Sequence, residues 1–151
     1  MADTTDIDAA EHREWGRRAN QRVWALLGDG TPADDDTKRE VVDAAHASQW
    51  HWSHAGGPLE AQRGEWLLSH VYAVVGDAPA ALRHAQRCLA ITEAEGYEDF
   101  DRAYAFEAMA RAHAVGGEVE PAREWRERAA EAGALIADDE DRKIFESDFA
   151  S

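Results

Sequence analysis

Hydrophobic residues recur every three or four positions along most of the chain, with polar residues between them. This spacing is typical of amphipathic α-helices, and the strict alternation of a half-buried β-strand is absent. Short segments rich in glycine, proline and acidic residues interrupt the pattern: GDGTP, AGGP, GDAP, EGYED, GGEVEP and ADDED. The sequence therefore predicts an all-α fold of about seven helices, over 7–27, 34–55, 58–75, 78–95, 99–115, 119–136 and 139–149.

Several of the interrupting segments share one arrangement. A glycine ends one helix in a left-handed conformation, an acid or threonine caps the next helix, and proline lies in its first turn. Thr31 with Pro32 and Asp77 with Pro79 fit this arrangement. Such short connections place consecutive helices antiparallel, so we expect a stack of helical hairpins. The prediction is a single domain over 1–151, with a flexible N-terminus at 1–6, hairpins at 7–55, 58–95 and 99–136, and a C-terminal capping helix at 139–149.

The capping helix carries Ile144, Phe145 and Phe149. These side chains are expected to cover the open apolar edge of the last hairpin, because the terminal element of a repeat stack has to shield it from water. Alternatively, they dock on a second copy of the chain and form a homodimer.

Composition and charge exclude several classes of protein. The chain has 151 residues and a net charge of −15, which argues against binding to the phosphate backbone of a nucleic acid. Its start lacks the features of a secretion signal, and no stretch is apolar enough for a membrane span, so we expect no membrane association and a cytoplasmic location. The single cysteine, Cys88, excludes an internal disulfide. Two lysines against fourteen arginines, with abundant alanine, are typical of a GC-rich bacterial genome.

The segment HASQWHWSH, residues 46–54, concentrates histidine and tryptophan. On a helix, one face presents Val41, Ala45, Ser48, Trp52 and Ala55, and a roughly opposite face presents Asp43, His46, Trp50 and His54. Two such faces suggest burial between hairpins. Packing is the first interpretation, a ligand pocket with His46 and Trp50 the second, and a metal held by His51 and His54 the third, because no metal-binding signature is present. No metal or cofactor is predicted.

Two segments of the chain correspond when Gly76 is aligned with Gly117: EWLLSHVYAVVGDAPAALRHAQRCLA and EAMARAHAVGGEVEPAREWRERAAE. The alignment pairs Tyr72 with His113, Ala81 with Ala122, and Cys88 with Ala129. Over residues 62–130 this pattern resembles the tetratricopeptide repeat, whose helix pair has an aromatic residue four positions before a turn glycine and an alanine five after it. The spacing from 76 to 117 exceeds the usual repeat of about 34 residues, His113 replaces the aromatic residue, and the first hairpin matches poorly. A helical bundle with alanine-rich seams is the alternative.

The resemblance implies a concave groove lined by the first helix of each pair. The matching positions are Arg63, Trp66, His70, Ala73 and Val74 in one repeat, and Tyr104, Glu107, Arg111, Ala114 and Val115 in the other. Their spacing independently places most of each set on one helical face. Those faces mix charged, imidazole and aromatic groups where a helix that only packed would carry leucine.

These groove residues support two interpretations. Arg63 and Arg111 would hold a carboxylate or a peptide terminus, with Trp66 and Tyr104 as apolar walls. Alternatively, Arg111 pairs with Glu107 at i, i+4, and Arg63 pairs with Glu60 or Glu107, in which case both arginines are structural.

The function predicted from the sequence is a non-catalytic interaction module that binds a protein or peptide partner through the groove, by analogy with such stacks. The alternative is a small-molecule-binding protein or enzyme with an enclosed pocket formed by Arg63, Trp66, His70, Tyr104, Glu107 and His46. Glu65, Glu107, His70 or His113 would supply acid–base chemistry there, but no motif selects a reaction, so no catalytic residue is assigned. Whether the groove is an open trough or is closed by the first hairpin distinguishes the two classes.

Overall fold

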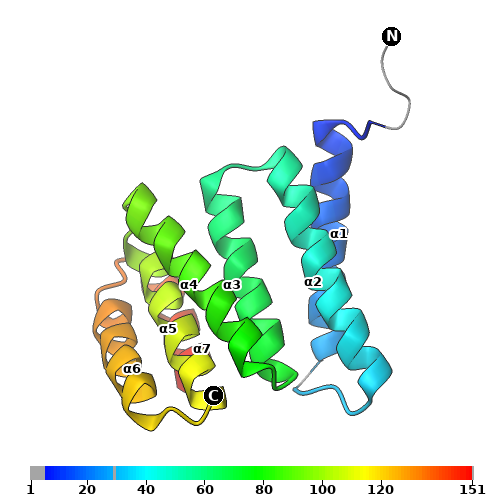
Figure 1. Cartoon of the computed structure of the whole chain (residues 1–151). Coiled ribbons are helices and arrows are strands. Elements are labelled where there is room, and N and C mark those ends of the chain that lie inside the picture. The colour runs from blue at the N-terminus through cyan, green and yellow to red at the C-terminus, as the bar shows by residue number, and fades with distance from the viewer. Residues whose placement is uncertain (1–5, 29, 151) are drawn as a thin grey trace.

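A computed structural model describes residues 6–28 and 30–150 of the chain. These residues form seven helices, and Figure 1 shows α1 to α6 following one another across the molecule, with α7 returning beside α5. The helices are α1 (Ala9–Leu27), α2 (Asp35–Ala55), α3 (Pro58–Val74), α4 (Ala78–Glu95), α5 (Asp99–Val115), α6 (Val119–Ala134) and α7 (Asp139–Ala150). The predicted all-α fold is therefore confirmed. The predicted flexible N-terminus at 1–6 lies outside the described residues, apart from Asp6.

Acidic side chains set where several helices begin. Asp8 accepts a hydrogen bond from the Glu11 backbone N–H at 2.9 Å, and the Glu11 carboxylate accepts one from the Asp8 N–H at 3.2 Å, so α1 starts two residues later than predicted. Asp34 caps α2 by accepting from the Thr37 N–H at 2.8 Å. The predicted cap at Thr31 is wrong because this nearer carboxylate satisfies the first free N–H groups of α2.

The turns after α3 and α5 have the same conformation. Gly76 and Gly117 adopt left-handed backbone angles, with φ of 86° and 75°. The N–H of the following residue donates to the Tyr72 carbonyl in one turn and to the His113 carbonyl in the other, at 2.9 and 3.0 Å. These reversals close the α3–α4 and α5–α6 hairpins.

Each helix packs against the next in the chain, and two additional contacts define the stack. α3 packs against α5, and α7 packs against α5 as well as α6. Within the described ranges, the α1 backbone approaches α2 but no other helix, so side chains fill the space between α1 and α3. None of the helices in those ranges has both the length and the apolar character that a bilayer span requires.

Three groups of buried side chains form the core. The first joins α1, α2 and α3 around Val23, Val41 and Leu68; the second joins α3, α4 and α5 around alanines and Met109; the third joins α5, α6 and α7 around Phe145. Trp66 of α3 packs against all three groups. This tryptophan therefore lies where the three hairpin units meet.

The C-terminal helix covers α5 and α6 through one residue. Phe145 is fully buried, and its ring lies where a Cβ at Gly133 would come within 2.2 Å, so only glycine fits at that position of α6. Phe149 is partly buried, but Ile144 is 51% exposed. The expectation that Ile144 also covers the apolar edge is wrong, because its side chain faces an open cleft instead.

The segment HASQWHWSH packs on one side only. Val41, Ala45 and Ser48 are buried, and the Trp52 indole lies so close to Gly16 that a Cβ there would come within 2.8 Å of Nε1. On the opposite face Trp50 is 52% exposed. Burial on both faces was expected and is not found: His46 contacts Tyr72 of α3 and Trp50 contacts His12 of α1, but these contacts leave both His46 and Trp50 exposed.

Candidate functional site

An open cleft of about 340 Å³ lies where α1, α3, α5 and α7 come together. We call it the aromatic cleft, because four aromatic rings and two aliphatic side chains form most of its wall. Its lining residues are Asn20, Trp24, Gln62, Arg63, Trp66, Leu67, Phe100, Asp101, Tyr104, Ile144 and Asp148. The cleft therefore contains Arg63, Trp66 and Tyr104, which the sequence predicted to line one groove.

The rings of the aromatic cleft contact one another in a row. The Trp24 and Trp66 centroids are 6.3 Å apart, Trp66 and Tyr104 meet at 5.5 Å and 89°, and Phe100 lies 4.6 Å from Tyr104. Trp24 nevertheless remains 45% exposed. A wall of this kind presents apolar surface to an incoming group without having to be rearranged.

Hydrogen bonds to carboxylates fix two of these rings. The Tyr104 hydroxyl donates to Asp148 Oδ2 at 2.6 Å, which ties α5 to α7. The Trp66 indole N–H donates to Glu107 Oε2 at 3.1 Å, which ties α3 to α5. Burial and the neighbouring Asp148 raise the pKa of Tyr104, so this hydroxyl keeps its proton and remains a donor.

Both arginines predicted to hold a carboxylate already have a carboxylate partner. Arg63 Nε donates to Asp101 Oδ1 at 3.1 Å, with the Arg63 side chain 58% exposed. Arg111 Nε donates to Glu107 Oε1 at 2.6 Å. The i, i+4 pairing of Glu107 with Arg111 is thus present, whereas the partner of Arg63 is neither Glu60 nor Glu107.

His70 completes the ring system as a neutral imidazole. Its ring stacks on Trp66 at 5.1 Å and lies 5.6 Å from Trp24. Its buried Nδ1 has no hydrogen-bond partner within 6–28 and 30–150. Burial, together with the nearby Arg111 guanidinium, lowers the pKa of His70 to about 4. His70 is therefore uncharged at neutral pH; it packs against Trp66 and Trp24 but is not among the described residues that line the aromatic cleft.

A second cleft of about 310 Å³ opens between α5 and α6, beside the end of α7. We call it the arginine cleft; its lining residues are Glu107, Ala110, Arg111, Ala114, Ala122, Arg123, Arg126 and Phe149. Tyr104 of the aromatic cleft lies on the same face of α5 as Glu107 and Arg111. The predicted residues Glu107 and Arg111 thus belong to this neighbouring cleft.

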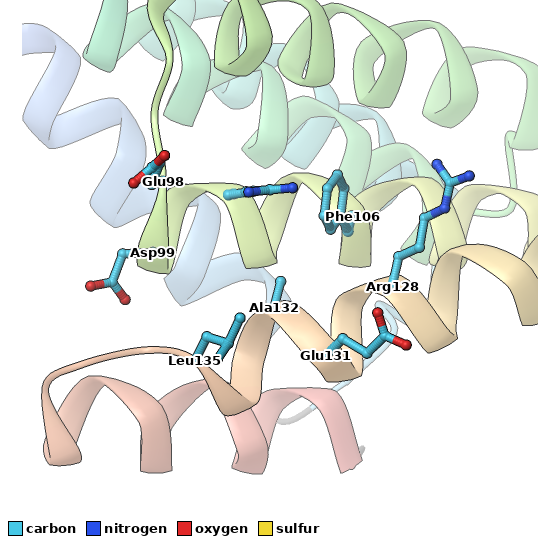
Figure 2. A pocket seen from close by; sticks show the side chains of 8 residues that line it. Glu98, Asp99, Phe106, Arg128, Glu131, Ala132 and Leu135 are labelled. Carbon is cyan, nitrogen blue, oxygen red and sulfur yellow. The ribbon is translucent and has the colours of Figure 1, made fainter.

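The largest cleft, about 550 Å³, lies on the opposite faces of α5 and α6. Figure 2 shows Phe106 of α5 and Arg128 and Glu131 of α6 projecting into it. Three acidic and two arginine side chains line it, and none of the predicted site residues does. Although this cleft is larger, its lining side chains offer no chemical group that the other two clefts lack.

The structure does not bring His46 and Trp50 to either groove cleft. His46 Nε2 is 2.7 Å from the Tyr72 hydroxyl, and Trp50 packs against the His12 and His54 rings at 5.3 and 4.6 Å. An enclosed pocket that combines His46 with Trp66 and Tyr104 is therefore not formed. In the described part of the chain, no three or more histidine, cysteine or acidic side chains gather in a way that could hold a metal ion.

Sequence reasoning missed several residues of this region. Trp24, Phe100 and Asp148 line the aromatic cleft, and Arg123 and Arg126 line the arginine cleft. Trp24 was missed because the first hairpin does not align with the other two, and Asp148 because α7 was considered only as a cap. A buried pair of Glu65 and His84, 2.6 Å apart, was also missed; it lies inside the stack of α3 on α4.

Comparison of the chain with protein-family models, with curated proteins and with solved structures finds no match. The function of the protein is therefore argued from the contacts described above.

Proposed function

We propose that the protein is a non-catalytic interaction module that binds an extended peptide segment of a protein partner across the aromatic and arginine clefts. The observation that carries this proposal is the row of pre-ordered rings in the aromatic cleft, open to solvent at Trp24 and Ile144. Of these rings Trp24 is the exposed one, and aromatic side chains next to a polar rim are common anchors of a binding surface.

The openness of the aromatic cleft favours a chain segment over an enclosed small molecule. Its rim residues Trp24, Arg63 and Ile144 are each about half exposed. A pocket for a small ligand would bury most of the ligand surface. A peptide needs only one side chain to enter the cleft while its backbone continues along the face of α5 towards α6.

The resemblance to tetratricopeptide repeats supports the same proposal by analogy, because stacks of this kind commonly hold peptides in a groove. The net charge of −15 gives no support to a nucleic-acid partner. A cytoplasmic location and a bacterial origin remain expectations from the sequence.

Selection from a phage-displayed library of random peptides tests the proposal, with wild-type protein as the target. Enriched peptides, made synthetically, are then titrated against wild type, Trp24→Ala and Trp15→Ala. Trp15 is a matched control, since it lies on the same helix, is similarly exposed and lines neither groove cleft. We expect Trp24→Ala to weaken binding about tenfold or more and Trp15→Ala to leave it nearly unchanged.

The proposal is wrong if no peptide is enriched on wild type relative to Trp24→Ala. It is equally wrong if every enriched peptide binds both variants with wild-type affinity, because the peptides then contact another surface. Native mass spectrometry of the purified protein addresses the alternative class: an additional mass that disappears in Trp24→Ala would replace the peptide with a small ligand.

A further inference from the structure

The arginine cleft is a locally basic place on a strongly acidic protein. The whole chain has 31 acidic residues against 16 lysines and arginines. Among the described residues that line this cleft the balance is reversed, with Arg111, Arg123 and Arg126 against one carboxylate, Glu107. Positive charge gathered in a concave site attracts an anionic group even when the net charge of the protein is negative.

Arg126 differs from most arginines of this protein because it forms no ion pair with any residue of the described ranges. Its guanidinium lies 4.2 Å above the Phe149 ring, and one N–H group donates to the Phe149 carbonyl at 3.1 Å. Stacking occupies the face of a guanidinium and leaves the remaining N–H donors pointing outward in its plane. Arg126 is thus held in place by contacts that do not neutralise it.

Arg111 supplies a second donor from α5. Nε and one terminal nitrogen contact Glu107 Oε1, while Glu107 Oε2 accepts from the Trp66 indole. The carboxylate is therefore shared between an arginine and a tryptophan. Arg123 lies at the outer edge, where it pairs with Glu120 of its own helix at 2.5 Å.

Small residues leave room between these donors. Ala110, Ala114 and Ala122 line the cleft, so no side chain longer than a methyl group projects from those positions. The resulting space, about 310 Å³, is ample for a carboxylate or a phosphate group with part of the chain that carries it.

From these observations we propose that the arginine cleft binds an anionic oxygen group, a carboxylate or a phosphate, with Arg126 as the principal donor and Arg111 as the second. This inference rests on the proposed function and deepens it. It states that the bound peptide carries an anionic group next to the side chain that enters the aromatic cleft. The anion would thus bind among α5, α6 and α7, whereas the sequence predicted that Arg63 and Arg111 bind it.

NMR detection of the arginine Nε–H signals tests this assignment without any peptide. Wild-type protein is titrated with sodium acetate and, separately, with sodium phosphate, and sodium chloride keeps the ionic strength constant. We expect saturable shifts of the Arg126 and Arg111 signals and no comparable shift of Arg128. Tighter binding of acetate would indicate a peptide carboxylate as the natural group, and tighter binding of phosphate would indicate a phosphorylated side chain.

Arg126→Gln is the decisive variant, because it removes the charge but keeps an amide that can donate to the Phe149 carbonyl. Arg128→Gln is its matched control: Arg128 lies two residues further along α6, stacks on Trp125 at 4.7 Å, and faces the cleft of Figure 2. We expect Arg126→Gln to weaken anion binding about tenfold or more, as loss of a charged hydrogen bond does, and Arg128→Gln to leave it unchanged.

Equal, non-saturating shifts of all arginine signals would overturn the proposal, as would unchanged binding in a folded Arg126→Gln protein. An unchanged melting temperature shows that the variant is folded. If Arg126→Gln unfolds the protein, Phe149→Leu is titrated instead. This variant removes the aromatic stack but keeps the charge of Arg126, so it has to retain saturable anion binding. Failure of the anion titration leaves the peptide result intact, and failure of the peptide selection leaves the anion result intact.

Discussion

Hydrogen bonds between single carboxylates and aromatic rings hold the groove together. Glu107 fixes Trp66, and Asp148 fixes Tyr104, in each case through one hydrogen bond between different helices. A buried polar group without a partner costs more than the hydrogen bond contributes, so these pairs select one arrangement of the rings. His70 Nδ1 has no such partner among the described residues, which makes this ring the exception.

Lowering the pH should destabilise the protein through His70. Its pKa is about 4 in the folded protein and 6.5 when unperturbed, so the unfolded chain binds a proton first as the pH falls. The stability that neutral His70 contributes is fully present above pH 6.5 and is lost between 6.5 and about 4. His46 and His51, whose pKa values are also lowered by burial, act in the same direction.

Chemical denaturation as a function of pH measures this effect. In His70→Gln the free energy of unfolding should depend less steeply on pH over that interval, by an amount of the order of 1–3 kcal/mol. The slope is the diagnostic quantity, because loss of stacking on Trp66 changes the stability of the variant at every pH. An unaltered slope in the variant would mean that His70 titrates normally.

Cys88 should be inert in the native protein. Burial raises the pKa of its thiol to about 12, and the side chain is inaccessible to solvent. Since the thiolate is the reactive form, we expect negligible reaction with a thiol reagent in mildly alkaline buffer and rapid, stoichiometric reaction in concentrated guanidinium chloride. Rapid labelling of folded protein would show that α4 opens locally.

At the scale of the helices, the close contact of α6 with α7 depends on one missing side chain. We expect Gly133→Ala to destabilise the protein by about 1–3 kcal/mol, because the added methyl group would lie 2.2 Å from the Phe145 ring. Gly116→Ala is the control: an added Cβ there would lie at ordinary contact distance, 3.5 Å, from its neighbours, and its φ is −76°. Urea unfolding of both variants measures the difference, and equal stabilities would show that α7 is not firmly docked.

The helices could be predicted from the sequence because their signals are local. Gly96 and Asp77, for example, end and begin helices by contacts within a few residues.

The site could be predicted only in part. Trp66 and Tyr104 were found from their repeat positions. The partner of Arg63, however, depends on how α3 is placed against α5. The role of Trp24 depends on how α1 is placed against α3. Neither arrangement produces a recognisable periodic pattern in the sequence.

At the scale of the whole molecule, the excess of acidic residues opposes folding. With a net charge of −15, the compact state has more self-repulsion than the unfolded chain, and most ion pairs lie on the surface where they contribute little. Added sodium chloride screens the repulsion, so the melting temperature should rise, by roughly 2–4 °C for each kcal/mol gained. Thermal unfolding near the isoelectric point is the control, where salt should have no stabilising effect.

Trp66 packs against all three core groups and, through Glu107, is tied to the α5–α6 hairpin. Stacks of hairpins can unfold piece by piece, because each unit touches only its neighbours. A side chain common to three units removes that independence, since no unit can open without exposing part of the same indole. This protein should therefore unfold in a single cooperative transition, and Trp66→Ala should separate it into steps that different spectroscopic probes resolve.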